Sequence, residues 1–263
     1  MKFISGRFVV YDMAGEPLIR HLESFKHGML NGPCYYYIDG KLNLIINYTD
    51  NKYDGEKLAY TNGIVNARVT YKLDLADGPY EEYYLNGSIK IRGQFKNDKK
   101  TGEWIYFDTN GNEIGRAVFK NDKLVEGVDV KFYDVSERVA VIEHYKNKKL
   151  NGQTIAFYNN GNIDFVGNYA DNKAVGTWRF YYPNGSVRQI RNYFNDKLNG
   201  LHFDFFQTGQ LAVAGKYVNG KKDGEWIRYN LDHSIDTVDV YVQGKKMKKK
   251  KIREEDNCDS DKH

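Results

Sequence analysis

The chain has little cysteine, little proline and no long hydrophobic run. Two cysteines, Cys34 and Cys258, and four prolines occur in 263 residues. Each cysteine is expected to be a small apolar filler or a free thiol rather than a metal ligand or a nucleophile. So few cysteines cannot build a disulfide framework, and they favour a reducing compartment.

No stretch approaches the roughly 18 consecutive apolar residues that a membrane-spanning helix needs. The N-terminus runs directly from Met1 into a repeated pattern at Gly6, without the apolar segment of a cleavable signal peptide. We therefore expect a cytoplasmic protein with no transmembrane segment, and the nucleus is the alternative if the source is eukaryotic or viral. Helical patterns are absent too, because glycine interrupts the chain every dozen residues or so.

Motifs that carry chemistry are also missing. The six histidines share no spacing, and none pairs with a cysteine or glutamate at ligand spacing. The phosphate-binding glycine loop, the hydrolase nucleophile motif and the zinc-protease helix motif do not occur. The recurrent Asp-Gly-Glu triplet supplies too few converging oxygens for calcium. The sequence therefore predicts no enzyme, no cofactor and no metal site.

What the chain has is a repeat. A glycine followed five residues later by an aromatic residue recurs ten times, and successive glycines are 23 to 26 residues apart. A fixed period of this size predicts an array of units that bury their apolar faces against their neighbours. The pairs are Gly6/Tyr11, Gly32/Tyr37, Gly55/Tyr60, Gly78/Tyr83, Gly102/Phe107, Gly127/Phe132, Gly152/Phe157, Gly176/Tyr181, Gly200/Phe205 and Gly224/Tyr229.

Each unit has the pattern of a β-hairpin. Asn-Gly pairs such as Asn86-Gly87 separate two alternating runs, which is a strong hairpin signal. Polar connectors such as residues 97–100 reverse the chain between units. In the first run we expect the third and fifth positions after the glycine, such as Ile105 and Phe107, to form the apolar pair of one sheet face.

A second aromatic lies about seven residues before the next glycine, as Phe95, Tyr169 and Tyr217 do. Two residues before it, several units carry another glycine, which has no side chain to pack. We expect this glycine to leave room for a ring from the neighbouring strand. It occurs as Gly93, Gly167 and Gly215.

Residues 102–111, 176–185 and 217–226 carry the Trp, aromatic and Asn-Gly positions of one motif. This motif resembles the variant MORN repeat (membrane occupation and recognition nexus), which reads G-x-W-x-x-Y-x-x-N-G. The resemblance covers roughly residues 6–244, although only three units keep the tryptophan. It implies an all-β fold, an elongated single-sheet array of about ten β-hairpin repeats of 23–26 residues.

The resemblance implies a non-enzymatic repeat scaffold that mediates protein–protein interaction, with a partner of unknown identity. An antitoxin-like inhibitor of a toxin partner is the alternative, since many bacterial members carry that label. An enzyme would need converging polar residues that break the repeat. The departures from pattern are interpreted as repeat decay or local salt pairing; they are Glu81 with Glu82, Asp129 with Glu126, and Arg179 with Arg188 and Arg191.

The sequence divides into the array, residues 1–244, and a charged tail, residues 245–263, which is expected to be disordered. A solvated end that protects the last strand is the favoured interpretation of the tail, because acidic residues follow its lysines within a Debye length. Nuclear localisation, or polyanion or peripheral lipid binding, is the alternative. The rest of the chain is nearly neutral, so no nucleic acid is expected. The tail lysines are Lys245, Lys246, Lys248, Lys249, Lys250 and Lys251.

Overall fold

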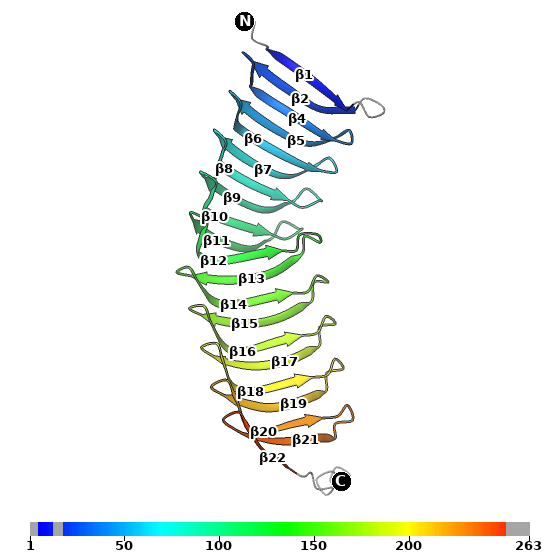
Figure 1. Ribbon diagram of the computed structural model, residues 1–263, viewed down its shortest axis with the longest axis vertical. Coiled ribbons are helices and arrows are strands. Elements are labelled where there is room, and N and C mark those ends of the chain that lie inside the picture. Colours follow the sequence, from blue (N-terminus) through cyan, green and yellow to red (C-terminus); the bar gives the residue numbers. More distant parts are fainter. Residues whose placement is uncertain (1–4, 13–17, 251–263) are drawn as a thin grey trace. The chain divides into compact units, whose positions relative to one another are not determined.

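The computed structural model describes residues 5–12 and 18–250, which form 22 β-strands and no helix (Figure 1). The expected all-β array of β-hairpin repeats is therefore confirmed. No helix in these two ranges has the length and apolar character needed to cross a bilayer. The chain divides into two compact units, Met1–Asp129 and Val130–His263.

The first unit is an open antiparallel sheet in which each strand pairs with the next along the chain. Strand β2 pairs with β1 and with both β3 and β4, and pairing then continues in order to β12. The strands are β1 (Gly6–Asp12), β2 (Leu18–Lys26), β3 (Met29–Leu30), β4 (Gly32–Ile38), β5 (Lys41–Thr49), β6 (Lys52–Thr61), β7 (Ile64–Lys72), β8 (Leu75–Tyr83), β9 (Ile89–Lys96), β10 (Lys99–Phe107), β11 (Glu113–Lys120) and β12 (Lys123–Phe132), whose last residues belong to the second unit.

The second unit repeats this arrangement from β13 to β22, again with each strand antiparallel to the next. Its strands are β13 (Val139–Lys146), β14 (Lys149–Phe157), β15 (Ile163–Ala170), β16 (Lys173–Tyr181), β17 (Val187–Phe194), β18 (Lys197–Phe205), β19 (Leu211–Val218), β20 (Lys221–Tyr229), β21 (Ile235–Val242) and β22 (Lys245–Lys250).

The end of the array lies beyond the expected boundary at residue 244. Lys245–Lys250 form β22, which pairs with β21 from Val242↔Lys245 to Val238↔Lys250. The repeat glycine is missing here, but an exposed strand edge still offers backbone donors and acceptors that another strand can satisfy. The tail boundary is corrected accordingly, and residues 251–263 lie outside the described residues.

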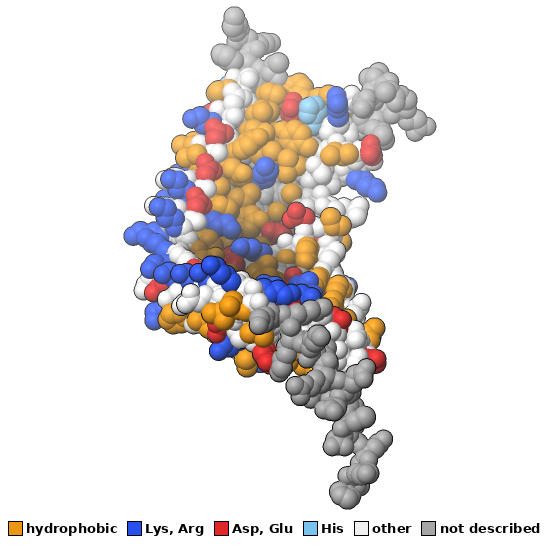
Figure 2. Space-filling view, turned by 60° about the horizontal axis from the view of Figure 1, so that its bottom comes forward, with side chains coloured by type: hydrophobic (Ala, Val, Ile, Leu, Met, Phe, Trp, Pro, Cys, Tyr) orange, Lys and Arg blue, Asp and Glu red, His pale blue; other side chains and the backbone are white. Residues whose placement is uncertain are grey.

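The more buried face differs from the expected one in most of the repeats. The second position after the repeat glycine is buried in β4, β10, β14, β16, β18 and β20, and the fourth is buried in β10 and β14. In β10, Trp104 and Tyr106 are 1% and 3% exposed, while Ile105 and Phe107 are half-buried. In β12 the third position, Val130, is buried instead, as expected. We call the face that carries the second and fourth positions the tryptophan face. Figure 2 shows hydrophobic side chains gathered on one face, with lysine and arginine side chains along an edge.

The rings of the tryptophan face form a ladder across neighbouring strands. Trp226 lies between the second aromatics on its two flanking strands, with ring centroids 5.0 Å from Tyr217 and 6.4 Å from Tyr241. Both contacts are edge-to-face, an arrangement that aromatic quadrupoles favour. The pattern recurs around Trp104 and Trp178.

Glycine makes the room for these indole rings. A Cβ atom added at Gly215 would overlap the Trp226 ring, and the same holds for Gly93 with Trp104 and for Gly167 with Trp178. The expectation that these glycines leave room for a neighbouring ring is therefore confirmed. A ring that fills this space buries apolar area that a single sheet layer would otherwise expose.

Polar contacts join each repeat to the one that follows. The Asp98 carboxylate, in the turn after β9, accepts a hydrogen bond of 2.7 Å from the Ala76 amide at the start of β8. Asp74, Asp122, Asn172 and Asp196 make the equivalent contact in other repeats. At the opposite edge, the Tyr84 hydroxyl donates to the Phe107 carbonyl at 2.7 Å. Backbone donors and acceptors at the ends of the strands are satisfied in this way by a neighbouring repeat.

Candidate functional site

The second unit contains a place where the tryptophan face stops being apolar. In β14 the second and fourth positions are Thr154 and Ala156, but in β18 they are His202 and Asp204. In β20 the fourth position is Arg228. Because side chains of one face repeat every second residue, these polar groups lie on the face that carries rings elsewhere.

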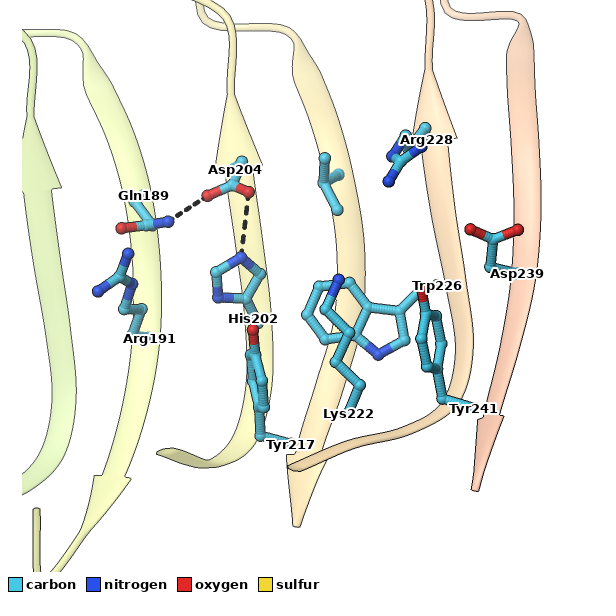
Figure 3. Close-up of a pocket in the computed structure, with 11 residues that line it drawn as sticks. Gln189, Arg191, His202, Asp204, Tyr217, Lys222, Trp226, Arg228, Asp239 and Tyr241 are labelled. Atoms are coloured by element: carbon cyan, nitrogen blue, oxygen red, sulfur yellow. Dashed lines mark hydrogen bonds and ion pairs between the residues drawn. The ribbon is translucent and has the colours of Figure 1, made fainter. Parts of the chain in front are cut away.

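A pocket of about 280 Å³ opens among these polar side chains (Figure 3). It lies entirely within the second unit, and five consecutive strands supply its lining. The lining residues are Gln189 and Arg191 from β17, His202 and Asp204 from β18, Val213 and Tyr217 from β19, Lys222, Trp226 and Arg228 from β20, and Asp239 and Tyr241 from β21.

A hydrogen-bonded network orients the His202 side chain. Asp204 accepts a hydrogen bond from Gln189 Nε2 through one oxygen, and its other oxygen lies 3.1 Å from His202 Nε2. Burial opposes ionisation of Asp204, but the contacts with His202 and Gln189 and the charge of Arg191 outweigh it, so the pKa of this carboxyl is lowered. Asp204 is therefore an anion at neutral pH.

Three cations of the pocket have no carboxylate partner among the described residues. Arg191, Lys222 and Arg228 each lie more than 4.0 Å from every described carboxylate oxygen. Arg191 stacks instead on the Phe180 ring, with 5.2 Å from its Cζ to the ring centroid. Lys222 Nζ lies 3.9 Å from the Trp226 ring centroid. These contacts hold the cations in place without neutralising them.

The positive charges also act on one another. Partial burial and the nearby charge of Arg228 lower the pKa of Lys222. The charges of Asp239 and Asp204 act in the opposite direction on the pKa of Lys222 but do not outweigh these effects, and Asp239 is also bound by Lys246 at 2.8 Å. The pocket therefore has an excess of positive charge.

Two ring nitrogens in the pocket are buried and have no hydrogen-bond partner among the described residues, His202 Nδ1 and Trp226 Nε1. Both side chains are about 5% exposed. The indole nitrogens of Trp104 and Trp178 share this condition, so the tryptophan alone is a property of the repeat. His202 is particular to this pocket. A buried polar atom without a partner carries a free-energy cost that a bound ligand can remove.

The aromatic residues predicted as repeat positions lie at the ends of the first strand of each hairpin. All nine are half-buried rather than fully buried, because alternation along the strand places the fifth position on the face opposite the second and fourth. They are Tyr37, Tyr60, Tyr83, Phe107, Phe132, Phe157, Tyr181, Phe205 and Tyr229.

All seven predicted repeat glycines have a positive φ, from 66° at Gly102 to 143° at Gly78, which side-chain-bearing residues rarely adopt. Close packing adds to the constraint at Gly78, where an added Cβ would lie 2.9 Å from the Thr70 Cβ atom. The seven are Gly55, Gly78, Gly102, Gly152, Gly176, Gly200 and Gly224.

The tail lysines fall into three groups. Lys245 and Lys246 are exposed on β22, and Lys246 is engaged by Asp239. Lys248, Lys249 and Lys250 belong to the same strand, but their side chains are not described. Lys251 lies outside the described residues. The structure therefore brings no defined basic cluster together from this segment.

Most of the residues that depart from the repeat make local contacts. Glu81 binds Arg92 at 3.1 Å, and Glu82 binds Lys90 at 2.9 Å. Arg188 lies 3.8 Å from Asp164. The salt-pairing interpretation is confirmed for these residues. Asp129 accepts a hydrogen bond from the Tyr106 hydroxyl.

Arg191 is the departure that lines the pocket, and sequence reasoning missed its neighbours. His202 stands at the position that the repeat motif gives to tryptophan, two residues after Gly200. The sequence does contain a signal for the pocket. Two successive repeats have polar or charged residues at the second or fourth position after the glycine: His202 and Asp204 in one, and Arg228 in the next. No group of three or more His, Cys, Asp or Glu side chains within the described ranges is placed to hold a metal ion.

Comparison with protein families finds the MORN repeat variant at residues 76–97 and 174–195, one segment in each unit. The predicted resemblance is confirmed there: the chain carries MORN repeat variants, and these repeats make it a repeat scaffold. None of the curated proteins matches it.

Solved structures that match are large and distant. They include TcdB2-TccC3-Cdc42 (10% identity, TM-score 0.14, 92% of this chain and 21% of that chain) and TcdB2-TccC3-TEV (11%, 0.14, 91% and 20%). A Tc holotoxin pore of Photorhabdus luminescens with a mutated TccC3 also matches (12%, 0.14, 90% and 20%). The chain spans about a fifth of the length of these chains. TM-scores of this size do not establish a shared fold.

Proposed function

We propose that this repeat scaffold binds a partner protein through the tryptophan face of its second unit, at the pocket between β17 and β21. The observation that carries the proposal is the set of three cations without carboxylate partners beside the buried His202. Burying polar groups such as His202 Nδ1 without a hydrogen-bond partner lowers the free energy of unfolding. Breaks in an otherwise consistent repeat are expected where a protein binds something.

The scaffold role is non-enzymatic. The pocket holds no serine, threonine or cysteine that His202 could activate as a nucleophile. Its aromatic and cationic lining resembles the composition of binding surfaces, which are enriched in tyrosine, tryptophan and arginine. An antitoxin-like inhibitor would bind its toxin through the same pocket. The identity of the partner protein decides between a general interaction scaffold and such an inhibitor.

Site-specific cross-linking tests this proposal. A photoreactive amino acid is placed at Val213, which lines the pocket, or at Leu201, which is exposed on the opposite face beside His202. Both full-length variants are irradiated in extract of the producing organism. We expect a discrete protein adduct from position 213 and none from position 201.

The outcome that contradicts the proposal is equally specific. Equal adduct patterns from the two positions, or adducts from position 201 alone, would show that the tryptophan face of the second unit is not the binding surface. Circular dichroism of both variants checks that the sheet is intact.

A further inference from the structure

The pocket has more positive charge than its own carboxylates balance. Arg191 and Arg228 reach it from β17 and β20, and Lys222 stands over the Trp226 ring. Both carboxylates of the lining already have partners, Asp204 in His202 and Gln189 and Asp239 in Lys246. A ligand that brings a negative charge would relieve the repulsion among these cations.

The hydrogen-bonding groups favour a planar oxyanion. A guanidinium group presents parallel N–H donors whose spacing matches a carboxylate. The Arg191 guanidinium is oriented by its contact with the Phe180 ring, and its buried Nε has no partner among the described residues. Trp226 Nε1 adds another donor without a partner. The pocket thus offers donors from β17 on one side and from β20 on the other (Figure 3).

The ligand also has to reach the His202 ring. His202 Nε2 lies 3.1 Å from Asp204, and Nδ1 is buried without a hydrogen-bond partner among the described residues. A peptide can satisfy Nδ1 whether that nitrogen donates or accepts, because it carries backbone N–H donors and C=O acceptors next to its side chains.

We propose that the pocket binds the carboxylate of an acidic residue in an extended segment of the partner protein. Arg191, Arg228 and Lys222 supply the positive charge, and His202 Nδ1 forms a hydrogen bond with the backbone of the same segment. The cavity, about 280 Å³, has room for a side chain with adjoining backbone and is far larger than a single water, about 30 Å³. This inference rests on the proposed function.

The three tryptophans make the binding measurable at defined places. Full-length protein labelled with ¹⁵N gives one indole signal from each of Trp104, Trp178 and Trp226. It is titrated with a capped pentapeptide that has one central glutamate, with the same peptide carrying glutamine, with acetate and with inorganic phosphate. We expect the glutamate peptide to move the Trp226 signal and to leave that of Trp104 in place, and the glutamine peptide to bind at least tenfold more weakly.

A matched pair of variants tests the role of the arginine. Arg228→Gln removes an exposed cation of the pocket, and Arg179→Gln removes an exposed cation from the opposite face of β16. The first substitution should weaken binding of the glutamate peptide about tenfold or more, because a charged hydrogen bond is lost. The second should leave the dissociation constant unchanged.

Several results would overturn the inference. They are equal binding of the glutamate and glutamine peptides, equal movement of the Trp104 and Trp226 signals, and no effect of Arg228→Gln. Binding of phosphate but not of the glutamate peptide would also overturn it. Acetate binding as tight as that of the peptide would show that a free carboxylate suffices and that no partner segment is needed.

The acidic residues of the chain itself are a possible competitor in this titration. Glu254, Glu255 and Asp256 follow β22 in the sequence. The titration is therefore repeated with a chain that ends at residue 250, and tighter binding to that chain supports an oxyanion site. If neither chain binds the glutamate peptide while position 213 still cross-links a protein, the carboxylate inference fails and the proposed function stands.

Discussion

Single residues determine how one layer of strands can have a buried interior. Each indole ring occupies the space above a glycine of the neighbouring strand. The second aromatic residues of two successive repeats flank it on both sides. The arrangement gives Trp178 about 6% exposure although the sheet is open. Ring and glycine are therefore a coupled pair, and changing either one alone disturbs the other.

This coupling predicts the effect of Gly167→Ala. The new methyl group would overlap the Trp178 ring, so we expect the free energy of unfolding to fall by about 1–3 kcal/mol. Urea unfolding followed by tryptophan fluorescence measures the loss. The double variant Gly167→Ala/Trp178→Leu should lose less than the sum of the two single variants, because the smaller side chain gives the methyl group room. Strict additivity would argue against ring-over-glycine packing.

The lowered pKa of Asp204 predicts a pH-dependent contribution to stability. A carboxyl whose folded-state pKa lies below its unfolded value of about 3.9 stabilises the fold above that value, and the stabilisation is lost as the pH falls through the folded-state pKa. Asp204→Asn should therefore lower the unfolding free energy by ~1 kcal/mol at pH 7. The difference should shrink as the pH falls below about 4. A difference that stays constant between pH 7 and pH 3 in denaturant titrations would contradict this account.

At the scale of strands, the last element is held by more than its backbone. Strand β22 pairs with β21 and supplies Lys246 to the nearly buried Asp239. Because β22 pairs with β21, Val238 and Tyr241 do not lie on the open edge of the sheet. These contacts make residues 245–250 part of the array.

A pair of truncated chains tests this assignment. A chain that ends at residue 244 loses all of β22, whereas a chain that ends at residue 250 keeps it. We expect the shorter chain to be less stable than the longer one by about 2–4 kcal/mol, since it loses backbone hydrogen bonds and one partner of a buried carboxylate. Equal midpoints in thermal unfolding would show that β22 is dispensable.

The sequence predicted the elements well because each is specified locally. The Asn-Gly turns, the alternating runs and the phased glycines fix where hairpins form, and the role of Gly93, Gly167 and Gly215 followed from the missing side chain. The more buried face could not be predicted, because both faces of a strand such as β10 carry apolar or aromatic residues: Trp104 and Tyr106 lie on one face, and Ile105 and Phe107 on the other. The edge strand at Lys245–Lys250 lacks the apolar alternation on which strand prediction depends.

The pocket was missed for a related reason. Arg191 was noticed as an irregularity, but its neighbours His202, Arg228 and Asp239 lie 11 to 48 residues away in the sequence. Only the strand pairing from β17 to β21 brings them together. Sequence spacing in a repeat identifies the positions that share a face of the sheet. The effect of an unusual residue at such a position depends on the side chains that lie beside it on neighbouring strands.

For the whole molecule, the repeat predicts that units can be removed. Deleting residues 152–175 removes one period between Gly152 and Gly176, so the flanking strands can re-form equivalent contacts. We expect a folded protein of lower stability that keeps its β-sheet circular dichroism and unfolds cooperatively. Deletion of residues 152–163, half a period, is the control and should abolish folding. Complete unfolding of the full-period variant would contradict nearest-neighbour stabilisation.

The contact from each turn carboxylate or amide back to the preceding repeat has a consequence for how such a chain can grow or shrink. The amide of Ala76 is completed by Asp98, and that of Ala174 by Asp196, so the acceptor lies 22 residues downstream in both cases. If a hairpin were copied without the turn that follows it, the amide near the start of its first strand would lose its side-chain acceptor. Duplication or deletion of a repeat in the gene should therefore be tolerated when each strand-start amide keeps its acceptor 22 residues downstream. The unit that is copied or lost is then a hairpin together with the first turn of the next repeat.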